Sequence, residues 1–555
     1  MEFDYVIVGG GSAGCALAAR LAENREARVC LIEAGGKGRN LFIRMPAGNG
    51  LVFGNAKLDW GFESVPQPAL NDRKIYFPRG RALGGSSIMN GMIYIRGVPQ
   101  DYDAWRESGL SGWGFSDLLP YFRRSQGAVD RKGVWHGVDG PVKTEASVNF
   151  GELEEAFIEA AVACGHQRLD DFNGLHRAGV GRTDSTVHRG IRQSSAISYL
   201  AKRPSNLKIL THRQAVRVIL EGGVAKGIET LGKEKIYARE EVILCQGAFG
   251  TPQTLMLSGI GPAAHLSQHG INAVVDLPGV GQSLADHVDV SMQYGSDRMD
   301  LSLARHQRLD RAAWLMARWL FNGSGPGGGA FFSSVIFHGL NDPVMPEFET
   351  FMTPMTVHEN MTDGDVEKAP LMQRLGRHLL VRGRQVAKPG VQIDINLERP
   401  KSLGTVCLAS ANPLDHPRID PRFFSHTDDL NAMVAGVKTM REIMAQPEIA
   451  KYVTGEIGAW QRAKTDAQII EAIRQTAYTG HHPCSSAKMG PDKDPLAVLD
   501  SELRVRGVDK LRVCDASAMP SQITGNLNAT VIAMAERGAD LILGKTPLVP
   551  ADPRI

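Results

Sequence analysis

The residues that decide the fold stand at positions 5–14 and read Tyr-Val-Ile-Val-Gly-Gly-Gly-Ser-Ala-Gly. The first four form a short apolar run that ends in glycine, which is typical of a buried strand. Residues 14–28 carry apolar side chains at helical spacing, and residues 28–33 form a second apolar run that ends in Glu33. This order predicts a βαβ unit of about 30 residues.

The glycines of this stretch fit the pattern GxGxxG at Gly9, Gly11 and Gly14. Gly9 would allow a tight turn, Gly11 the close approach of a pyrophosphate, and Gly14 close packing of helix on strand. Free N–H groups at the start of the helix favour an anion. Glu33 then stands where an acid accepts ribose hydroxyls. A glycine-rich turn without a ligand is the alternative, but the complete unit favours a dinucleotide.

Two further glycine-rich blocks occupy residues 78–91 and 247–262. In the first, successive backbone N–H groups left uncovered by small residues could clasp the remainder of a bound flavin. In the second, Pro252 stands where a helix could begin. The first block favours FAD over NAD(P), because a single N-terminal fingerprint leaves it without an explanation.

The pattern along the chain predicts two domains. Residues 299–478 favour longer strands and amphipathic helices. The C-terminal end again shows a strand that ends in an acid and is followed by a helix, as at the N-terminal end. We predict an α/β fold, with α+β character in the second domain. A Rossmann-like FAD-binding domain is expected over residues 1–145, 205–300 and 480–555. An inserted substrate-binding domain with an antiparallel sheet is expected over residues 146–204 and 301–479.

Composition excludes several classes of protein. The 555 residues carry a formal charge of +2, which is too balanced for the basic surface of a nucleic-acid-binding protein. The seven cysteines are scattered and never form a CxxC pair, so neither a disulfide framework nor a zinc site is indicated. Residues 1–5 show no secretory signal, and no apolar run of about 18 residues occurs. These features favour a cytoplasmic protein.

Five ordered motifs carry a resemblance to a known family. They are the blocks at 78–97 and 247–262, the pair His482-Pro483, and the segments at 515–520 and 525–528. Together they resemble the glucose-methanol-choline (GMC) flavoprotein oxidoreductases, and the resemblance covers nearly the whole chain. Within that family the sequence is most similar to bacterial choline dehydrogenases and to FAD-linked dehydrogenases of primary alcohols.

The resemblance implies that His482 and Asn526 are catalytic. Oxidising an alcohol removes a hydroxyl proton and a hydride, so a neutral imidazole can take the proton while an amide holds the oxygen. A structural histidine in a loop is the alternative. His481 could suggest a metal site, but no further ligand follows at a suitable spacing, so we expect no metal.

The resemblance also implies a set of cofactor-binding residues. They are Gly9, Gly11, Ser12, Ala13, Gly14, Glu33, Ala34, Arg81, Gly85, Ser86, Asn90, Gly91, Met92, Val216, Asp515, Ala516 and Asn526. Some oxidases of the family hold FAD covalently through a histidine, and here that position is Met89. Noncovalent FAD is therefore expected.

Substrate residues are less well marked. Alternation places Glu347, Glu349 and Phe351 on one strand face, which could bind a quaternary ammonium such as choline. If the opposite face of residues 348, 350 and 352 lines the pocket, an apolar alcohol is favoured. An acidic strand face in contact with solvent is the third interpretation. On balance the sequence favours a neutral alcohol.

The resulting hypothesis is an FAD-dependent alcohol dehydrogenase that makes an aldehyde by hydride transfer to flavin N5 and passes electrons to a quinone or another acceptor. The alternatives are an alcohol or choline oxidase that uses O₂ and makes hydrogen peroxide, a non-redox flavin-containing cyanohydrin lyase, and a non-catalytic FAD-binding protein. The amphipathic segment 312–321, with Trp314, Arg318 and Trp319, suggests peripheral contact with the inner face of a membrane, with core packing as the alternative. A homo-oligomer is a further hypothesis.

Overall fold

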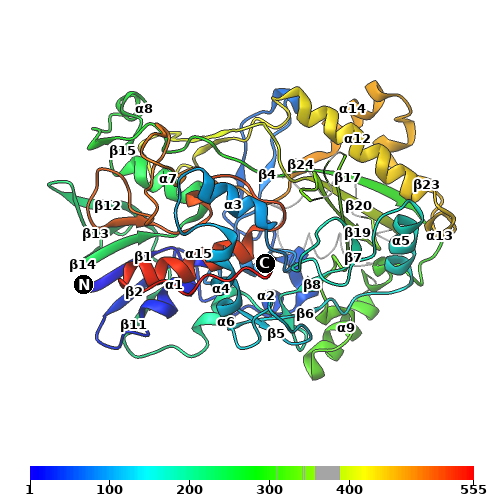
Figure 1. Ribbon diagram of the computed structural model, residues 1–555, viewed down its shortest axis with the longest axis horizontal. Helices are drawn as coiled ribbons and strands as arrows, with labels where there is room; N and C mark the ends of the chain where they lie inside the picture. Colours follow the sequence, from blue (N-terminus) through cyan, green and yellow to red (C-terminus); the bar gives the residue numbers. More distant parts are fainter. Residues whose placement is uncertain (308, 341, 343, 357–387, 555) are drawn as a thin grey trace.

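The computed structural model describes all residues except 308, 341, 343, 357–387 and 555, and it contains two seven-stranded sheets (Figure 1). The first sheet has the strand order β11-β2-β1-β14-β13-β12, with β25 paired to β14. Its strands are β1 (Glu2–Val8), β2 (Val29–Ile32), β11 (Leu207–Leu210), β12 (Ala215–Glu221), β13 (Val224–Thr230), β14 (Lys235–Leu244) and β25 (Leu511–Val513).

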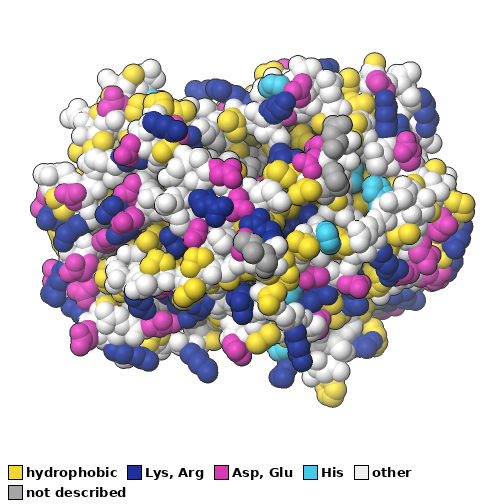
Figure 2. All heavy atoms as spheres, in the orientation of Figure 1, with side chains coloured by type: hydrophobic (Ala, Val, Ile, Leu, Met, Phe, Trp, Pro, Cys, Tyr) yellow, Lys and Arg dark blue, Asp and Glu magenta, His cyan; other side chains and the backbone are white. Residues whose placement is uncertain are grey.

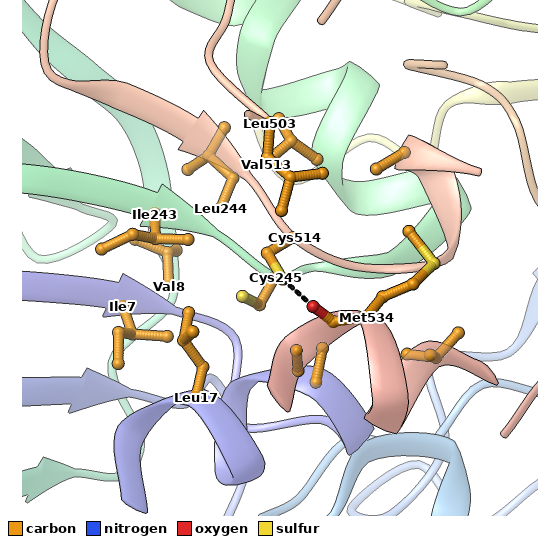
Figure 3. Close-up of a cluster of buried hydrophobic side chains, with 14 of the residues drawn as sticks. Ile7, Val8, Leu17, Ile243, Leu244, Cys245, Leu503, Val513, Cys514 and Met534 are labelled. Atoms are coloured by element: carbon orange, nitrogen blue, oxygen red, sulfur yellow. Dashed lines mark hydrogen bonds between the residues drawn. The ribbon is translucent and has the colours of Figure 1, made fainter. Parts of the chain in front are cut away.

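The centre of this sheet is parallel. β1 lies between β2 and β14 and runs parallel to both, and β25 runs parallel to β14. Helices α1 (Ser12–Leu21) and α15 (Leu527–Ile542) pack against it, and their contact includes the ion pair of Arg20 with Glu536 at 2.7 Å. Figure 3 shows the buried cluster where Leu17 and Met534 of the two helices meet strand residues such as Leu244. Residues 5–8 of β1 are apolar, as expected where a strand is covered on both faces.

The second sheet has the order β23-β17-β20-β19-β18-β7, with β24 on β17, and all its pairings are antiparallel. Its strands are β7 (Gly179–Arg182), β17 (Val288–Gly295), β18 (Ser334–His338), β19 (Phe348–Thr353), β20 (Gly390–Leu397), β23 (Gly455–Glu456) and β24 (Ala477–Thr479). One face packs on helices α5 (Glu152–Ala163), α12 (Thr427–Met444) and α14 (Asp466–Thr476) through a single apolar cluster. The other face is mainly polar on β17 and β20 and carries apolar residues such as Val335, Phe337 and Phe351 on β18 and β19.

The predicted fold class is confirmed. β1, β14 and β25 bring the start, the centre and the end of the chain into one sheet, and the antiparallel sheet is built largely from the segments between them. The pairing of β17 bears on one of the proposed domain boundaries. β17 lies inside the stretch 205–300 that was assigned to the FAD-binding domain, yet it pairs along its whole length with β20. We therefore place the division before residue 288.

The remaining elements connect or cover the sheets. The helices are α2 (Leu41–Arg44), α3 (Pro99–Glu107), α4 (Phe115–Ser125), α6 (Ser195–Leu200), α7 (Gly247–Leu257), α8 (Ala263–Gln268), α9 (Leu309–Asn322) and α13 (Pro447–Ala450). The short strands are β3 (Phe62–Glu63), β4 (Tyr76–Phe77), β5 (Gln126–Ala128), β6 (Val142–Ala146), β8 (Asp184–Ser185), β9 (Val187–His188), β10 (Ile191–Arg192), β15 (Ile260–Gly261), β16 (Val275–Asp276), β21 (Thr405–Cys407) and β22 (Arg418–Asp420).

Helix α9 bears on the predicted membrane contact. Trp319 is buried and its indole N–H donates to the Gly190 carbonyl at 2.6 Å, so this side chain serves packing. Trp314 is 55% exposed and the Arg318 guanidinium stacks on it, while Phe321 is 89% exposed. The projection at the lower edge of Figure 2, over α9, carries apolar and basic side chains. No helix among the described residues is long and apolar enough to span a membrane. Peripheral contact remains a prediction.

Candidate active site

A cavity of about 1460 Å³ is lined by residues of both sheets. Its lining runs from the glycine turn after β1, past the loop at 78–92, to His482 and to the polar face of the second sheet. The cavity is large enough for both a dinucleotide and a small substrate.

The three fingerprint glycines have different structural reasons. Gly9 has a φ of +102°, and a Cβ there would lie 2.4 Å from the Cys245 carbonyl oxygen. A Cβ on Gly14 would lie 1.9 Å from the Gly9 carbonyl oxygen. A Cβ on Gly11, by contrast, would meet no protein atom closer than the Gly85 Cα at 3.8 Å. Gly9 and Gly14 are therefore required by the fold, whereas Gly11 keeps space open beside the start of α1.

Glu33 closes the other side of this space. Its Oε2 accepts from the Gly10 N–H at 2.9 Å and its Oε1 accepts from the Gly35 N–H at 2.7 Å. Burial raises the pKa of the Glu33 carboxyl, and these backbone donors work against that shift. Each oxygen keeps a further lone pair for a ligand hydroxyl. The arrangement fits a dinucleotide, with its pyrophosphate at Gly11 and its ribose at Glu33.

The cavity brings together nearly all the cofactor residues expected from the sequence. Those that line it are Gly9, Gly11, Ser12, Ala13, Glu33, Ala34, Arg81, Gly85, Ser86, Asn90, Gly91, Met92, Val216, Asp515, Ala516 and Asn526. Gly14 lies just behind, where it serves packing. The Asp515 carboxylate accepts from the Gly247 N–H at 2.8 Å and from the Thr251 hydroxyl at 2.6 Å, so it also holds the start of α7.

Sequence reasoning missed Arg192, which lies behind the loop that carries Asn90. The guanidinium is fully buried, and it donates to the Asn90 carbonyl at 2.7 Å, the Asn90 side-chain oxygen at 2.8 Å and the Asn49 side-chain oxygen at 3.0 Å. Burial lowers its pKa to about 9. Asn49 and Asn90 both line the cavity, so Arg192 holds two parts of its wall.

The residues expected to be catalytic meet at the far end of the cavity. The Asn526 Nδ2 and the His482 Nε2 are 3.2 Å apart, although 44 positions separate them in the chain. The Asn526 Oδ1 is buried and has no hydrogen-bond partner among the described residues. Burial lowers the pKa of His482 well below its usual range, and the positive potential of His287, His481 and Arg79 adds to this. His482 is therefore neutral at neutral pH.

The neighbouring His481 does not join this pair. It has a φ of +66°, its N–H donates to the Thr479 hydroxyl at 2.8 Å, and its carbonyl accepts from the Arg79 guanidinium at 3.1 Å. Within the described part of the chain, no three His, Cys, Asp or Glu side chains are grouped so that they could hold a metal ion.

The polar face of the second sheet forms a further wall of the cavity, besides the loop at 78–92. Alternating residues of three strands form rows across it: Asp289, Asn396 and Glu349; Ser291, Asp394 and Phe351; and Gln293, Gln392 and Thr353. All of these except Glu349 line the cavity. A face of buried polar side chains next to a histidine is suited to hold a polar substrate.

Two carboxyl groups stand out on this wall. Asp394 accepts from the Gln392 amide at 2.8 Å and from the Tyr478 hydroxyl at 3.0 Å, whereas the Asp289 Oδ1 has no partner among the described residues. Burial raises the pKa of both carboxyls, and the charge of Asp394 raises that of Asp289 further. A bound cation would oppose both shifts and favour the ionised pair.

The residues expected to bind substrate differ in where they lie relative to the cavity. Phe351 lines the cavity. Glu349 is fully buried on the same face, and burial raises its pKa to about 8 while the charge of Arg177 works against that shift. Glu347 accepts from the Leu340 N–H at 2.9 Å and does not line the cavity. The carboxyls that the second sheet presents to the cavity are those of Asp289 and Asp394, which sequence reasoning missed. The alternation Val-Gln-Ile-Asp-Ile-Asn-Leu-Glu at 391–398 was a signal for them.

Comparison with known proteins identifies a family for the chain. The N-terminal GMC oxidoreductase family model matches residues 3–289, and the C-terminal model matches residues 400–535. The chain is 37% identical to the oxygen-dependent choline dehydrogenase of Photobacterium profundum, over 99% of this chain and 94% of that protein. It is 38% identical to the protein of the same name from Brucella anthropi, over 100% of this chain and 97% of that one.

Solved structures show the same architecture. Pyridoxine 4-oxidase from Mesorbium loti is 29% identical with a TM-score of 0.84, covering 98% of this chain and 100% of that one. A formate oxidase variant from Aspergillus oryzae, studied for FAD modification, is 28% identical with a TM-score of 0.87, covering 98% of each chain. The fingerprint turn, the cavity, the His482–Asn526 pair and these matches lead to one conclusion: the chain belongs to the GMC oxidoreductase family.

Proposed function

We propose that this protein oxidises a primary alcohol to an aldehyde, with His482 as the base and Asn526 as the group that holds the substrate oxygen. Like other members of the family, it is a flavoprotein that binds FAD. The observation that carries the proposal is the 3.2 Å contact between the Asn526 amide and the His482 Nε2 at the end of the cavity. An alcohol oxygen placed there meets a proton acceptor and a hydrogen-bond donor at once.

The side chains have separate tasks in this reaction. When bound, FAD supplies the acceptor for the hydride that leaves the alcohol carbon. The His482 Nε2 accepts the hydroxyl proton, because the lowered pKa keeps the imidazole neutral. The Asn526 amide donates to the same oxygen and fixes the direction of the C–H bond. Phe332 and Phe351, whose rings are 5.5 Å apart, line the cavity beside the site and restrict water.

We propose a quinone or a similar carrier as the electron acceptor, with O₂ as the second candidate. Only the names of similar proteins favour O₂. The relatives from Photobacterium and Brucella are called oxygen-dependent, and the structural neighbours from Mesorbium and Aspergillus are named as oxidases. Turnover of the purified protein with a soluble quinone under argon, compared with turnover in air, tests this. Hydrogen peroxide formed at the rate of aldehyde production would favour the oxidase.

We further propose that the alcohol carries a positive charge. Asp289 and Asp394 present buried carboxyls to the cavity, and the Asp289 Oδ1, which has no hydrogen-bond partner among the described residues, is costly to bury unless a ligand compensates it. The sequence favours a neutral alcohol because the acidic face of Glu347 and Glu349 is interpreted there as facing solvent, and neither residue lines the cavity. Choline, the substrate named for the relatives, is the simplest alcohol with such a charge.

Replacing Asp289 by asparagine tests the charge. We expect the KM for choline to rise about tenfold, equivalent to about 1.4 kcal/mol of lost binding. The KM for 3,3-dimethylbutan-1-ol, a neutral alcohol of the same shape, should change less than about twofold, because it makes no charge interaction. Steady-state kinetics with both alcohols gives the comparison. An equal rise for the two alcohols would show that Asp289 shapes the cavity without recognising charge.

The same carboxyls predict a pH dependence. Their pKa values are raised in the free protein, so at lower pH a cation must displace a bound proton before it gains a charged partner. The KM for choline should therefore fall as pH increases, and the KM for the neutral alcohol should not. Titration of His482 affects both substrates and cancels in their ratio. A ratio that does not vary with pH would contradict the role of the carboxyl pair.

A further inference from the structure

The dipeptide Asp286-His287, just before β17, holds His482 at two points. The Asp286 Oδ1 accepts from the His482 backbone N–H at 2.8 Å, and its Oδ2 accepts from the Thr479 hydroxyl at 2.5 Å. The His287 Nδ1 lies 2.9 Å from the His482 Nδ1, with the two rings at an interplanar angle of 81°. One residue thus fixes the backbone of His482 and the next contacts its ring.

The hydrogen bonds of His287 determine which of its nitrogens carries a proton. Its Nε2 lies 3.0 Å from the Ile523 carbonyl oxygen, which can accept a hydrogen bond but has none to donate. The Nε2 therefore carries hydrogen. The ring is fully buried, which disfavours a second proton. A neutral His287 then presents a lone pair at Nδ1.

This assignment fixes the tautomer of His482. The 2.9 Å contact between the two Nδ1 atoms needs one hydrogen, and because His287 has none there, His482 must donate it. A neutral His482 with hydrogen on Nδ1 has a lone pair on Nε2. The Asn526 Nδ2, which is a donor, faces that nitrogen at 3.2 Å, as this tautomer requires. The opposite tautomer would need a doubly protonated His287 in the interior.

We propose that His287 is a positioning residue that holds His482 in the tautomer whose Nε2 can accept the substrate proton. The proposal rests on the proposed role of His482 as the base. In that reaction the proton moves from the alcohol oxygen to the His482 Nε2, and the hydrogen on Nδ1 stays with the bond to His287. In the other tautomer Nε2 would already carry hydrogen and could not accept a proton.

Other charged and titratable groups surround the histidine pair. They are Asp286 on the same segment, Glu398 at the end of β20, His481 beside His482, and Arg79. The Glu398 Oε1 is 3.5 Å from the His287 Nδ1, a longer contact than the 2.9 Å to His482. The Glu398 Oε2 accepts from the Gly525 N–H. The shorter contact indicates that the His287 Nδ1 makes its hydrogen bond with His482 and not with the Glu398 Oε1.

Nitrogen NMR of the resting holoenzyme tests the tautomers directly. The FAD-loaded protein would be labelled with ¹⁵N-histidine, and the two residues assigned by comparison with the His287→Asn and His482→Gln variants. We expect protonated Nδ1 and unprotonated Nε2 for His482, and the reverse for His287. Hydrogen on the Nε2 of His482, or on both nitrogens of His287, would overturn the proposal.

Two variants separate hydrogen bonding from packing. Asparagine at position 287 can place its Oδ1 near the position of Nδ1, whereas leucine has a similar volume and no acceptor. We expect kcat/KM to fall on the order of 100-fold in His287→Leu and less than about tenfold in His287→Asn. Equal losses in two variants that keep wild-type FAD content would indicate a packing role and overturn the proposal. So would wild-type activity in His287→Leu.

The acid limb of the kcat/KM profile adds a readout that packing alone would not move. The acceptor at His287 stabilises the imidazolium of His482, because the hydrogen bond from Nδ1 strengthens when the ring gains charge at Nε2. The acid limb of His287→Leu should therefore lie at lower pH than that of the wild type or of His287→Asn. Failure of the proposed function is distinguishable: if His482→Gln remained fully active, His482 would not be the base, while the NMR result would still decide the tautomer.

Discussion

Replacing His482 by alanine is expected to lower kcat/KM for the alcohol by about 10³-fold while the protein still binds FAD. A positioned general base contributes roughly 10² to 10⁴ in rate. Rapid-mixing measurement of flavin reduction under anaerobic conditions isolates the step, because it excludes the reaction with the electron acceptor.

Asn526→Ala provides the matched control for this prediction. The amide holds the oxygen but takes no proton, so its loss should cost about 10-fold to 100-fold, less than the loss of His482. Solvent of higher pH should restore part of the activity of the His482 variant, since hydroxide can then remove the proton. A loss smaller than about tenfold in His482→Ala would mean that the base lies elsewhere.

Replacing Gly11 by valine is expected to weaken FAD binding by about 100-fold without unfolding the protein. The backbone at Gly11 has φ −80° and ψ −159°, which any residue can adopt, and a Cβ there meets no protein atom within 3.8 Å. The added methyl groups would instead occupy the space beside the start of α1, where a pyrophosphate must approach the backbone. Fluorescence titration of the FAD-free protein measures the dissociation constant.

Gly14→Ala is the contrasting variant. Its Cβ would lie 1.9 Å from the Gly9 carbonyl oxygen, so the helix and strand must separate, at a cost on the order of 1–3 kcal/mol. We expect a lower Tm of the FAD-free protein for Gly14→Ala and an unchanged Tm for Gly11→Val. If Gly11→Val bound FAD as tightly as the wild type does, the phosphate would not lie against this turn.

The first domain could be predicted from the sequence because its signals are local. The apolar run of β1, the glycine turn and the acid at Glu33 lie within 33 residues, and each constrains the backbone next to it. The His482–Asn526 pair was accessible through resemblance, since motifs around both residues match one family. The structure adds the contact between them.

The residues that sequence reasoning missed are those whose partners are distant in the chain. His287 contacts His482 across 195 positions, and Arg192 reaches Asn90 across 102. Nothing in the local pattern around either residue states which loop it will meet. The two carboxyls are a different case. Alternation at 391–398 marks Asp394 as lying on a polar face, but only the strand order shows that this face borders the cavity.

The measurement that tests the central claim most directly is anaerobic mixing of the FAD-loaded protein with choline while the flavin absorbance is followed. The account predicts loss of the oxidised flavin band in the wild-type protein and loss about 10³-fold slower in His482→Ala. In Asp289→Asn, the rate of loss should reach its maximum only at higher choline concentrations than in the wild type. Slow return of the band in air would support a dehydrogenase, and fast return an oxidase. An oxidised band that persists with choline, with other cationic alcohols and with neutral ones would contradict hydride transfer from an alcohol to the flavin.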